Sequence, residues 1–301
     1  MVAAHFDREA SSRFASLRGL QAGPHSGSWV STLPGGPADT PGFSAPEWQA
    51  LCRFRCGVPF CSGSRCGGCG ASLDAFGDHA SGCAACGLYA RHNRARGALA
   101  DEARLAGATV APGEQSPQGS SKRPADLLIS FPDDPIPDAC DVSVGHPLQL
   151  SSHLAAVSPG ALAERMEKAK VLENGPLCAS AGWRCTPVCV ETTGVWGPSA
   201  QKLVRRIVKL QSMRLGQPTS EVANHVWRRL NAAVAKGTAI MLTRAYTGTF
   251  DVGRPPVGTL GRASSQQPLA SPPEPQPPGP APPPNLGPAA SDLLLARHLC
   301  T

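Results

Sequence analysis

The fold prediction rests on residues 123–144, which read RPADLLISFPDDPIPDACDVSV. Two short apolar runs, residues 125–129 and 139–144, flank a stretch rich in Pro and Asp. Apolar runs of this length, bounded by turn residues, are typical of neighbouring β-strands. Each run carries an acid, Asp126 at the start of the first and Asp141 inside the second. We therefore predict two adjacent strands with one carboxylate on each.

The two carboxylates admit two interpretations. A carboxylate in an otherwise apolar strand is costly to bury unless it is paired or binds a metal. Asp126 and Asp141 on adjacent strands can share one Mg²⁺, which takes oxygen ligands and keeps waters that can attack a phosphate. In the simpler interpretation they cap strand ends or pair with Arg123. The residues alone favour neither.

Apolar spacing predicts the other elements. The pattern predicts helices over residues 44–60, 92–106, 159–173, 199–215 and 219–236, the first capped by Ser44 and the last ended by Gly237. It predicts further strands at 186–192 and 239–247, and hence an α/β fold with a mixed sheet flanked by helices. The basic helix 199–215 either follows a DNA backbone or presents a solvated face. We expect Trp183 and Trp196 to pack inside the fold, and His146 and His153 to lie at the surface.

Both ends of the chain differ in composition from this core. Residues 1–43 are predicted to be a flexible N-terminal segment, and residues 111–123 a polar loop. Residues 251–301 are predicted to be a disordered tail, because eleven of the 21 positions from 268 to 288 are Pro. The core is accordingly assigned to residues 91–250.

A cysteine and histidine cluster occupies residues 61–90. Cys66, Cys69, His79 and Cys83 follow the spacing C-x2-C-x9-H-x3-C, which is typical of a tetrahedral zinc knuckle. Cys61 and Cys86 are nearby substitutes for the fourth ligand, and cysteines scattered by composition are the simpler interpretation. A closed four-ligand site of this kind is structural. Basic residues that flank it could contact phosphates: Arg65, Arg91, His92, Arg94 and Arg96.

Composition is consistent with an intracellular protein that meets anionic partners. The chain has 301 residues, a net charge of +6 and 12 Cys. We recognise neither a signal peptide nor a run long enough to span a membrane. In a reducing compartment clustered Cys bind metal more often than they pair. The sequence does not indicate an oligomeric state.

The order of these motifs resembles a known arrangement. The zinc cluster with GASLDAFGDHA (70–80) is followed by RHN (91–93), KRPAD (122–126), DVSV (141–144), a helix with Lys and VETTG (190–194). Over residues 44–215 this is similar to the C-terminal tail of non-LTR retrotransposon polyproteins. That tail carries a zinc knuckle and a restriction-like endonuclease of the PD-(D/E)XK superfamily.

The resemblance implies a Mg²⁺-dependent nuclease that nicks DNA, with the RNA of the element as a further partner and the nucleus as its location. It assigns Asp126 and Asp141 as metal ligands. Ser143 stands where the superfamily usually has its Lys, so the Lys is expected on the next helix, with Lys170 the first choice and Lys168 the second. Glu102 is a candidate extra ligand, with a solvated Glu as the simpler interpretation.

The chain departs from the family by lacking a reverse transcriptase, so we expect a detached tail. The alternative function is an inactive, zinc-dependent module that binds nucleic acid.

Overall fold

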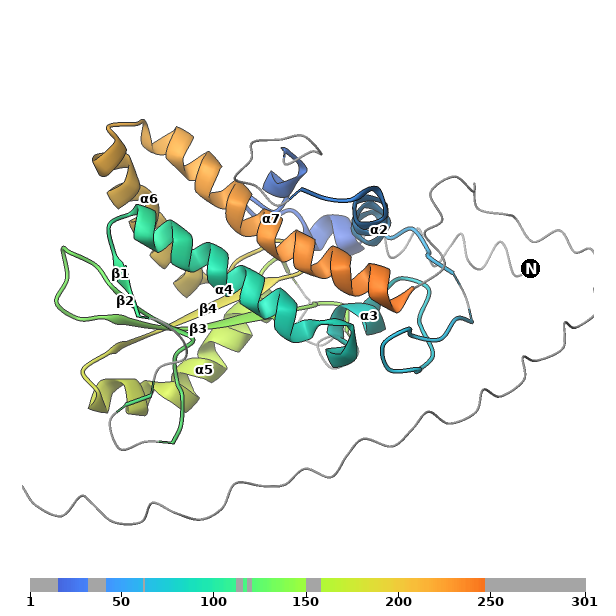
Figure 1. Cartoon of the computed structure of the whole chain (residues 1–301), viewed down its shortest axis with the longest axis horizontal. Helices are drawn as coiled ribbons and strands as arrows, with labels where there is room; N and C mark the ends of the chain where they lie inside the picture. The colour runs from blue at the N-terminus through green and yellow to red at the C-terminus, as the bar shows by residue number, and fades with distance from the viewer. Residues whose placement is uncertain are drawn as a thin grey trace, which may run out of the picture. The chain divides into compact units, whose positions relative to one another are not determined.

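The computed structural model describes residues 16–31, 42–61, 63–111, 116–117, 121–149 and 158–246. Its centre is a four-stranded sheet in the order β1-β2-β3-β4 (Figure 1). The strands are β1 (Thr109–Val110), β2 (Leu127–Ser130), β3 (Asp138–Gly145) and β4 (Arg184–Glu191). β2 is antiparallel to β1 and β3, whereas β3 and β4 are parallel. The predicted mixed sheet is confirmed, and β1 is an addition that immediately precedes the predicted loop 111–123.

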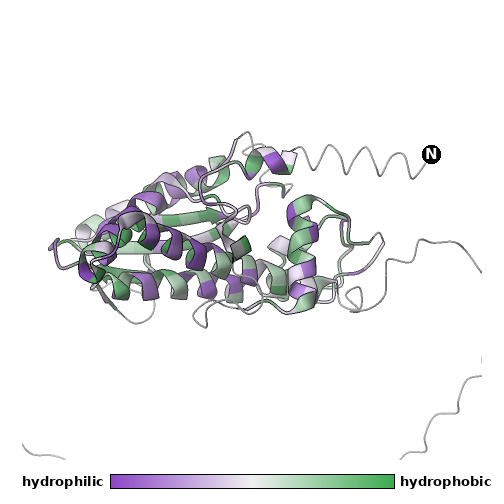
Figure 2. Cartoon of the chain, turned by 90° about the horizontal axis from the view of Figure 1, so that it is seen from above, coloured by the Kyte–Doolittle hydropathy of each residue, from purple (hydrophilic) through white to green (hydrophobic). Residues whose placement is uncertain are grey.

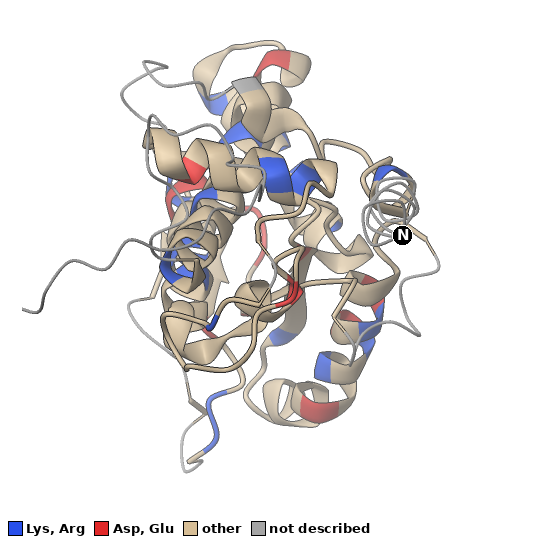
Figure 3. Ribbon diagram, turned by 90° about the vertical axis from the view of Figure 1, so that its right-hand side faces the viewer, with Lys and Arg blue, Asp and Glu red and all other residues tan. Residues whose placement is uncertain are grey.

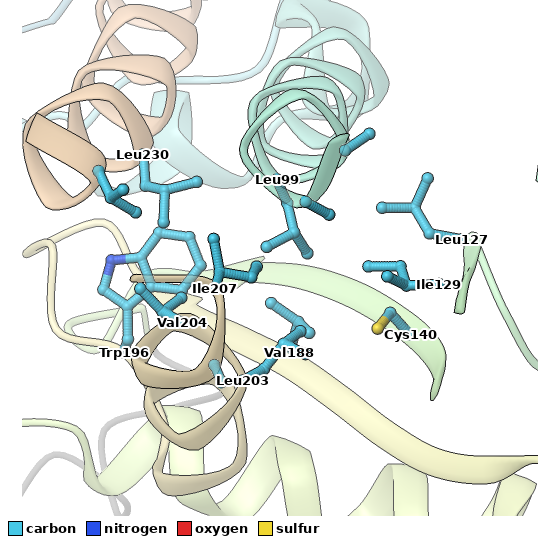
Figure 4. Packing of buried hydrophobic residues seen from close by; sticks show 14 of the residues in the cluster. Leu99, Leu127, Ile129, Cys140, Val188, Trp196, Leu203, Val204, Ile207 and Leu230 are labelled. Atoms are coloured by element: carbon cyan, nitrogen blue, oxygen red, sulfur yellow. The ribbon is translucent and has the colours of Figure 1, made fainter. Parts of the chain in front are cut away.

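Helices cover both faces of this sheet. On one face lie α4 (Leu88–Leu105), α6 (Pro198–Leu215) and α7 (Thr219–Ala245), and their apolar side chains form the main core with Cys140 and Val188 (Figure 4). On the other face lies α5 (Ala161–Ser180), which connects the parallel strands and packs Cys178 against Ala139. The helices carry both hydrophilic and hydrophobic residues, as expected for elements that cover a core (Figure 2).

The C-terminal strand predicted at 239–247 is wrong, because α7 continues to Ala245. Gly237 was expected to end the helix, but it lies where α4 crosses α7. A Cβ at this position would stand 2.6 Å from Cγ and 2.9 Å from Cα of Arg91. The glycine therefore permits close helix contact rather than ending a helix.

Part of the predicted flexible segment 1–43 is packed. Trp29, in the short helix Ser28–Ser31, is buried in a cluster with Phe43 and residues of α7. The ring of His25 stacks on Trp227 with 4.7 Å between centroids. Because the residues that anchor this segment lie some 200 positions away, its local composition gave no sign of the contact.

The predicted helix at 44–60 is α2 (Ala45–Cys56), and it begins with the capping box of Ser44 and Glu47. Among the described residues no helix is long and apolar enough to cross a membrane. Trp196 is buried in the core and Trp183 packs against the Cys178 cluster, as expected. The predicted tail 251–301 and His153 lie outside the described residues.

Candidate functional site

The four predicted zinc ligands converge. The ligand atoms of Cys66, Cys69, His79 and Cys83 all lie within 4.8 Å of one another. Sγ of Cys66 is 3.9 Å from Sγ of Cys83, near the roughly 3.8 Å expected between two sulfurs on one tetrahedral zinc ion. This cluster of three Cys and one His can bind zinc. Of the substitutes, Cys86 contacts Cys66 at 3.3 Å from outside this set, and Cys61 contacts Ser64.

Local backbone structure positions these ligands. Arg65 and Ser72 form an isolated β-bridge around a turn through Gly70, which has φ 74°, and N–H of Cys66 donates to the carbonyl oxygen of Ala71. Gly68 admits the packing of Cys86, because a Cβ there would stand 2.8 Å from its sulfur. The carboxylate of Asp74 accepts a hydrogen bond of 2.7 Å from N–H of His79 and so fixes the start of α3 (Asp78–Gly82).

The thiol of Cys66 is prepared for metal binding. Burial raises its pKa, but hydrogen bonds from the backbone N–H groups of Cys69 and Gly68 and from neighbouring side chains outweigh burial. They lower the pKa of Cys66 to about 6. Because the thiolate is the form that binds metal, this favours a ligand at neutral pH.

Two buried side chains connect the zinc cluster to the end of β3. His146 was expected at the surface, but it is buried between Asp78 at 2.8 Å and Thr192 at 2.7 Å. Arg91 was expected to contact phosphates, but it is also buried. Its guanidinium donates to the carbonyl oxygens of Ser81 in α3 and Val144 in β3. Both corrections have one cause, because these two side chains bridge α3 and the end of β3.

The predicted carboxylates lie at the edge of β3. β2 pairs with β3 only as far as Leu127 and Cys140, and Asp126 immediately precedes this point. One carboxylate oxygen of Asp126 accepts N–H of Val142 at 2.7 Å, and the other lies 3.4 Å from Nε2 of His92. Asp126 thus occupies the place that a longer β2 would fill.

Asp141 meets a different set of partners on α5. Its carboxylate pairs with Lys170 at 2.6 Å and accepts a hydrogen bond from Asn174 at 2.9 Å. Lys168 instead pairs with Glu164 and is 72% exposed. The structure therefore places Lys170, the first-choice lysine, beside Asp141, and Lys168 away from it.

The spacing of α5 explains this difference. Met166, Lys170, Asn174 and Cys178 recur every four residues and therefore share one helix face. All four meet β3 in order, with Met166 near Gly145, Lys170 and Asn174 at Asp141, and Cys178 at Ala139. The stripe of Glu164, Lys168 and Leu172 faces outward and is exposed.

The two acids differ in protonation behaviour. Burial raises the pKa of Asp141, and the charge of Asp126 adds to this, against the opposing effect of Lys170. Burial also acts to raise the pKa of Asp126, but the hydrogen bonds from His92 and Val142 hold it below its ordinary value. Both side chains keep some exposure, 15% for Asp126 and 22% for Asp141. An ion could therefore reach them.

A cavity of about 430 Å³ adjoins this pair. Its walls come from the start of α4, the end of β3 and the middle of α5. His92 lines the cavity and also contacts Asp126. Ser143, at the position where the superfamily usually has its Lys, lines it as well.

Glu102 lies outside the acidic site and is not exposed to solvent. It is fully buried, accepts a hydrogen bond of 2.8 Å from Gln211 and pairs with Arg229 at 3.0 Å. Both earlier interpretations of this residue are wrong, because it is the ion-pair partner that joins α4 to α6 and α7.

Two residues of the acidic site went unrecognised in the sequence. The sequence pattern indicated His92 only as a basic residue beside the cluster of Cys and His, and it did not indicate a role for Asn174. The four-residue spacing from Lys170 to Asn174 was the available signal, since it puts both on one helix face. Nothing local to His92 indicated Asp126 as its partner.

Exposed basic residues of the described chain lie on several elements, including α4, α5 and α6. Positions of Lys and Arg lie among those of Asp and Glu on the side shown in Figure 3. On the basic helix α6, Lys202, Arg205 and Lys209 are exposed, while Arg206 pairs with acids that include Asp133. Comparison with protein-family models and with curated proteins finds no match to this chain.

Proposed function

We propose that this protein is a Mg²⁺-dependent endonuclease of the PD-(D/E)XK type that nicks DNA. The observation that carries the proposal is the meeting of Asp126, Asp141 and Lys170 beside a cavity, at the end of β2 and on β3 and α5. The sequence order of these residues and of the preceding cluster of Cys and His resembles that of the retrotransposon tail, which supports the proposal. Such a nuclease would release a 3′ hydroxyl from which DNA synthesis can start.

The donor set suits Mg²⁺. Both carboxylates are partly exposed, and each ionised oxygen has a second lone pair beyond its present hydrogen bond. The charge of Asp126 disfavours ionisation of Asp141, and a bound cation would relieve this repulsion. When bound, Mg²⁺ would supply charge neutralisation at the phosphate and lower the pKa of a water.

The side chains around the two acids would each have a separate role in the reaction. Asn174 and Lys170 orient the carboxylate of Asp141, and Val142 and His92 orient that of Asp126. The ammonium of Lys170 would hold the attacking water by hydrogen bonding. The water oxygen bonds to phosphorus, the bond from phosphorus to the 3′ oxygen breaks, and the proton released by the water ends on that oxygen. The zinc cluster would hold the end of β3 through Asp78 and Arg91.

One observation favours the alternative, an inactive zinc-dependent module that binds nucleic acid. Every carboxylate oxygen of the pair already has a partner within the protein: His92, Val142, Lys170 and Asn174. In this case the two acids stabilise the edge of the sheet and the joint with α5, which is sufficient reason for their presence.

A nicking assay separates the two functions. Supercoiled plasmid is incubated with the wild-type protein, Asp141→Ala and the control Asp101→Ala, whose carboxylate is exposed on α4 and pairs with Arg104. We expect Mg²⁺-dependent nicking by the wild type and the control, and none by Asp141→Ala. If no protein nicks while all three bind DNA, the endonuclease is refuted and the binding module stands.

A further inference from the structure

We infer that the cavity beside the acidic pair binds an unpaired nucleobase of the nucleic acid. The inference rests on the proposed function for its class of ligand, and it adds a recognition site that the nuclease mechanism does not require. Four properties of the cavity support it: its volume, an exposed aromatic ring, a buried positive charge and its position.

The volume and lining suit a small aromatic ligand. Cavities that hold small molecules typically span about 300–1,000 Å³ and combine apolar walls with a few polar groups. This one measures about 430 Å³, and its apolar walls come from Leu88, Val144 and Met166. The hydroxyl of Ser143 adds a donor and an acceptor, which is the complement that a base edge needs.

Tyr89 supplies the stacking surface. Tyr89 lines the cavity while it remains 67% exposed, so its ring is accessible to a ligand. Its ring lies nearly parallel to that of His92, at 14° and with 6.2 Å between centroids. A base placed against Tyr89 would extend this stack, and every base offers a face for it.

The charge of the cavity also favours such a ligand. Arg91 lines the cavity and is buried, and among the described residues its guanidinium contacts carbonyl oxygens but no carboxylate. Its Nε–H has no acceptor within the described part of the chain. A positive wall without a compensating acid attracts an electron-rich ring and the phosphate attached to it.

The position places the base next to the reacting phosphate. His92 belongs to both sites, since it lines the cavity and lies 3.4 Å from Asp126. A base held by Tyr89 would therefore belong to a nucleotide at or next to the scissile bond. Because a paired base is not available to such a cavity, the preferred substrate would carry an unpaired or displaced base there.

The test measures base stacking without cleavage. Oligonucleotides with one 2-aminopurine, either unpaired within a duplex or fully paired, are titrated with protein in buffer without Mg²⁺. We expect the wild type to quench the unpaired probe and to bind it more tightly than the paired probe. Tyr89→Ala should bind roughly 5- to 150-fold more weakly and lose the quenching, and Tyr89→Phe should retain both.

The control is Leu172→Ala, a large exposed side chain on the outward face of α5, which should behave as the wild type. Equal quenching by Tyr89→Ala, equal affinity for the two probes, or no binding of either would overturn the inference. The two proposals fail separately. Tyr89-dependent quenching by a protein that never nicks refutes only the nuclease, and nicking with Tyr89-independent quenching refutes only the base site.

Discussion

Replacement of Lys170 by Met is the sharpest test of the acidic site, because Met keeps the apolar stem and removes only the charge. With 2.6 Å between Nζ and the carboxylate of Asp141, the Coulomb attraction is about 6 kcal/mol at an effective dielectric constant of about 20. Desolvation offsets most of this. Exposed pairs contribute about 0.2–1 kcal/mol, and breaking a buried pair costs about 3–5 kcal/mol. Lys170 and Asp141 are 19% and 22% exposed, which places the loss at about 1–3 kcal/mol.

The matched control lies two residues away on the same helix. The side chain of Lys168 is 72% exposed and pairs with Glu164, so Lys168→Met should change the free energy of unfolding by less than about 0.5 kcal/mol. Urea denaturation measures the stability of both variants. In the nicking assay Lys170→Met should lose about 10²- to 10⁴-fold in rate, and Lys168→Met should stay near the wild type. Nicking by Lys170→Met at the wild-type rate would refute the role given to this lysine.

Three further predictions concern zinc, pH and helix packing. Cys69→Ser changes an exposed candidate ligand and should lower bound zinc from about one ion per chain, whereas Cys56→Ser, at an exposed Cys outside the cluster, should not. Zinc content is measured by mass spectrometry. Unchanged zinc in Cys69→Ser would contradict the assignment of the cluster as a zinc site. The raised pKa of Asp141 keeps its carboxyl group protonated to higher pH. The rate of nicking at subsaturating Mg²⁺ should therefore fall as the pH drops, with a midpoint above the ordinary Asp pKa of about 3.9. A midpoint at or below this pKa would count against the assignment of Asp141. Gly237→Ala should destabilise the fold by about 1–3 kcal/mol in urea denaturation, because its Cβ would lie 2.6 Å from Cγ of Arg91. The control Gly97→Ala should stabilise the fold by about 0.5–1 kcal/mol, because no neighbouring element lies within 4 Å of the added Cβ. Equal effects of the two substitutions would contradict the packing argument.

The sequence predicted what depends on short-range pattern. The two central strands, the helix cap at Ser44 and the cluster of three Cys and one His all follow from spacing within about 20 residues, and the structure contains each of them. Helix α7 shows the limit of such patterns. A Gly after a run of apolar residues is a normal stop signal, but at Gly237 the missing side chain makes room for α4, which lies some 140 residues earlier.

The acidic site shows the same limit more closely. The sequence found Asp126 and Asp141 but could not choose between Lys168 and Lys170, because both lie at the edge of the apolar face of one helix. The choice depends on how α5 is rotated against β3, and that rotation is set by distant contacts, Cys178 on Ala139 and Met166 near Gly145. His146 was misjudged for a related reason, since its partner Asp78 comes from the zinc cluster.

Strand β2 begins only at Leu127, and this late start links the acids to the cavity. On the side of β3 that faces β2, the residues after Cys140 have no partner strand in the described part of the chain. Unpaired backbone groups there would be costly. Two side chains replace the strand: Asp126 accepts the N–H of Val142, and Arg91 donates to the carbonyl of Val144. A fully paired edge would leave no space for a ligand, whereas side chains leave the opening that His92 and Ser143 line. The shortness of β2 thus both fixes the orientation of Asp126 and creates the cavity beside it, which is why a catalytic acid and a base-binding site would lie together at this point of the sheet.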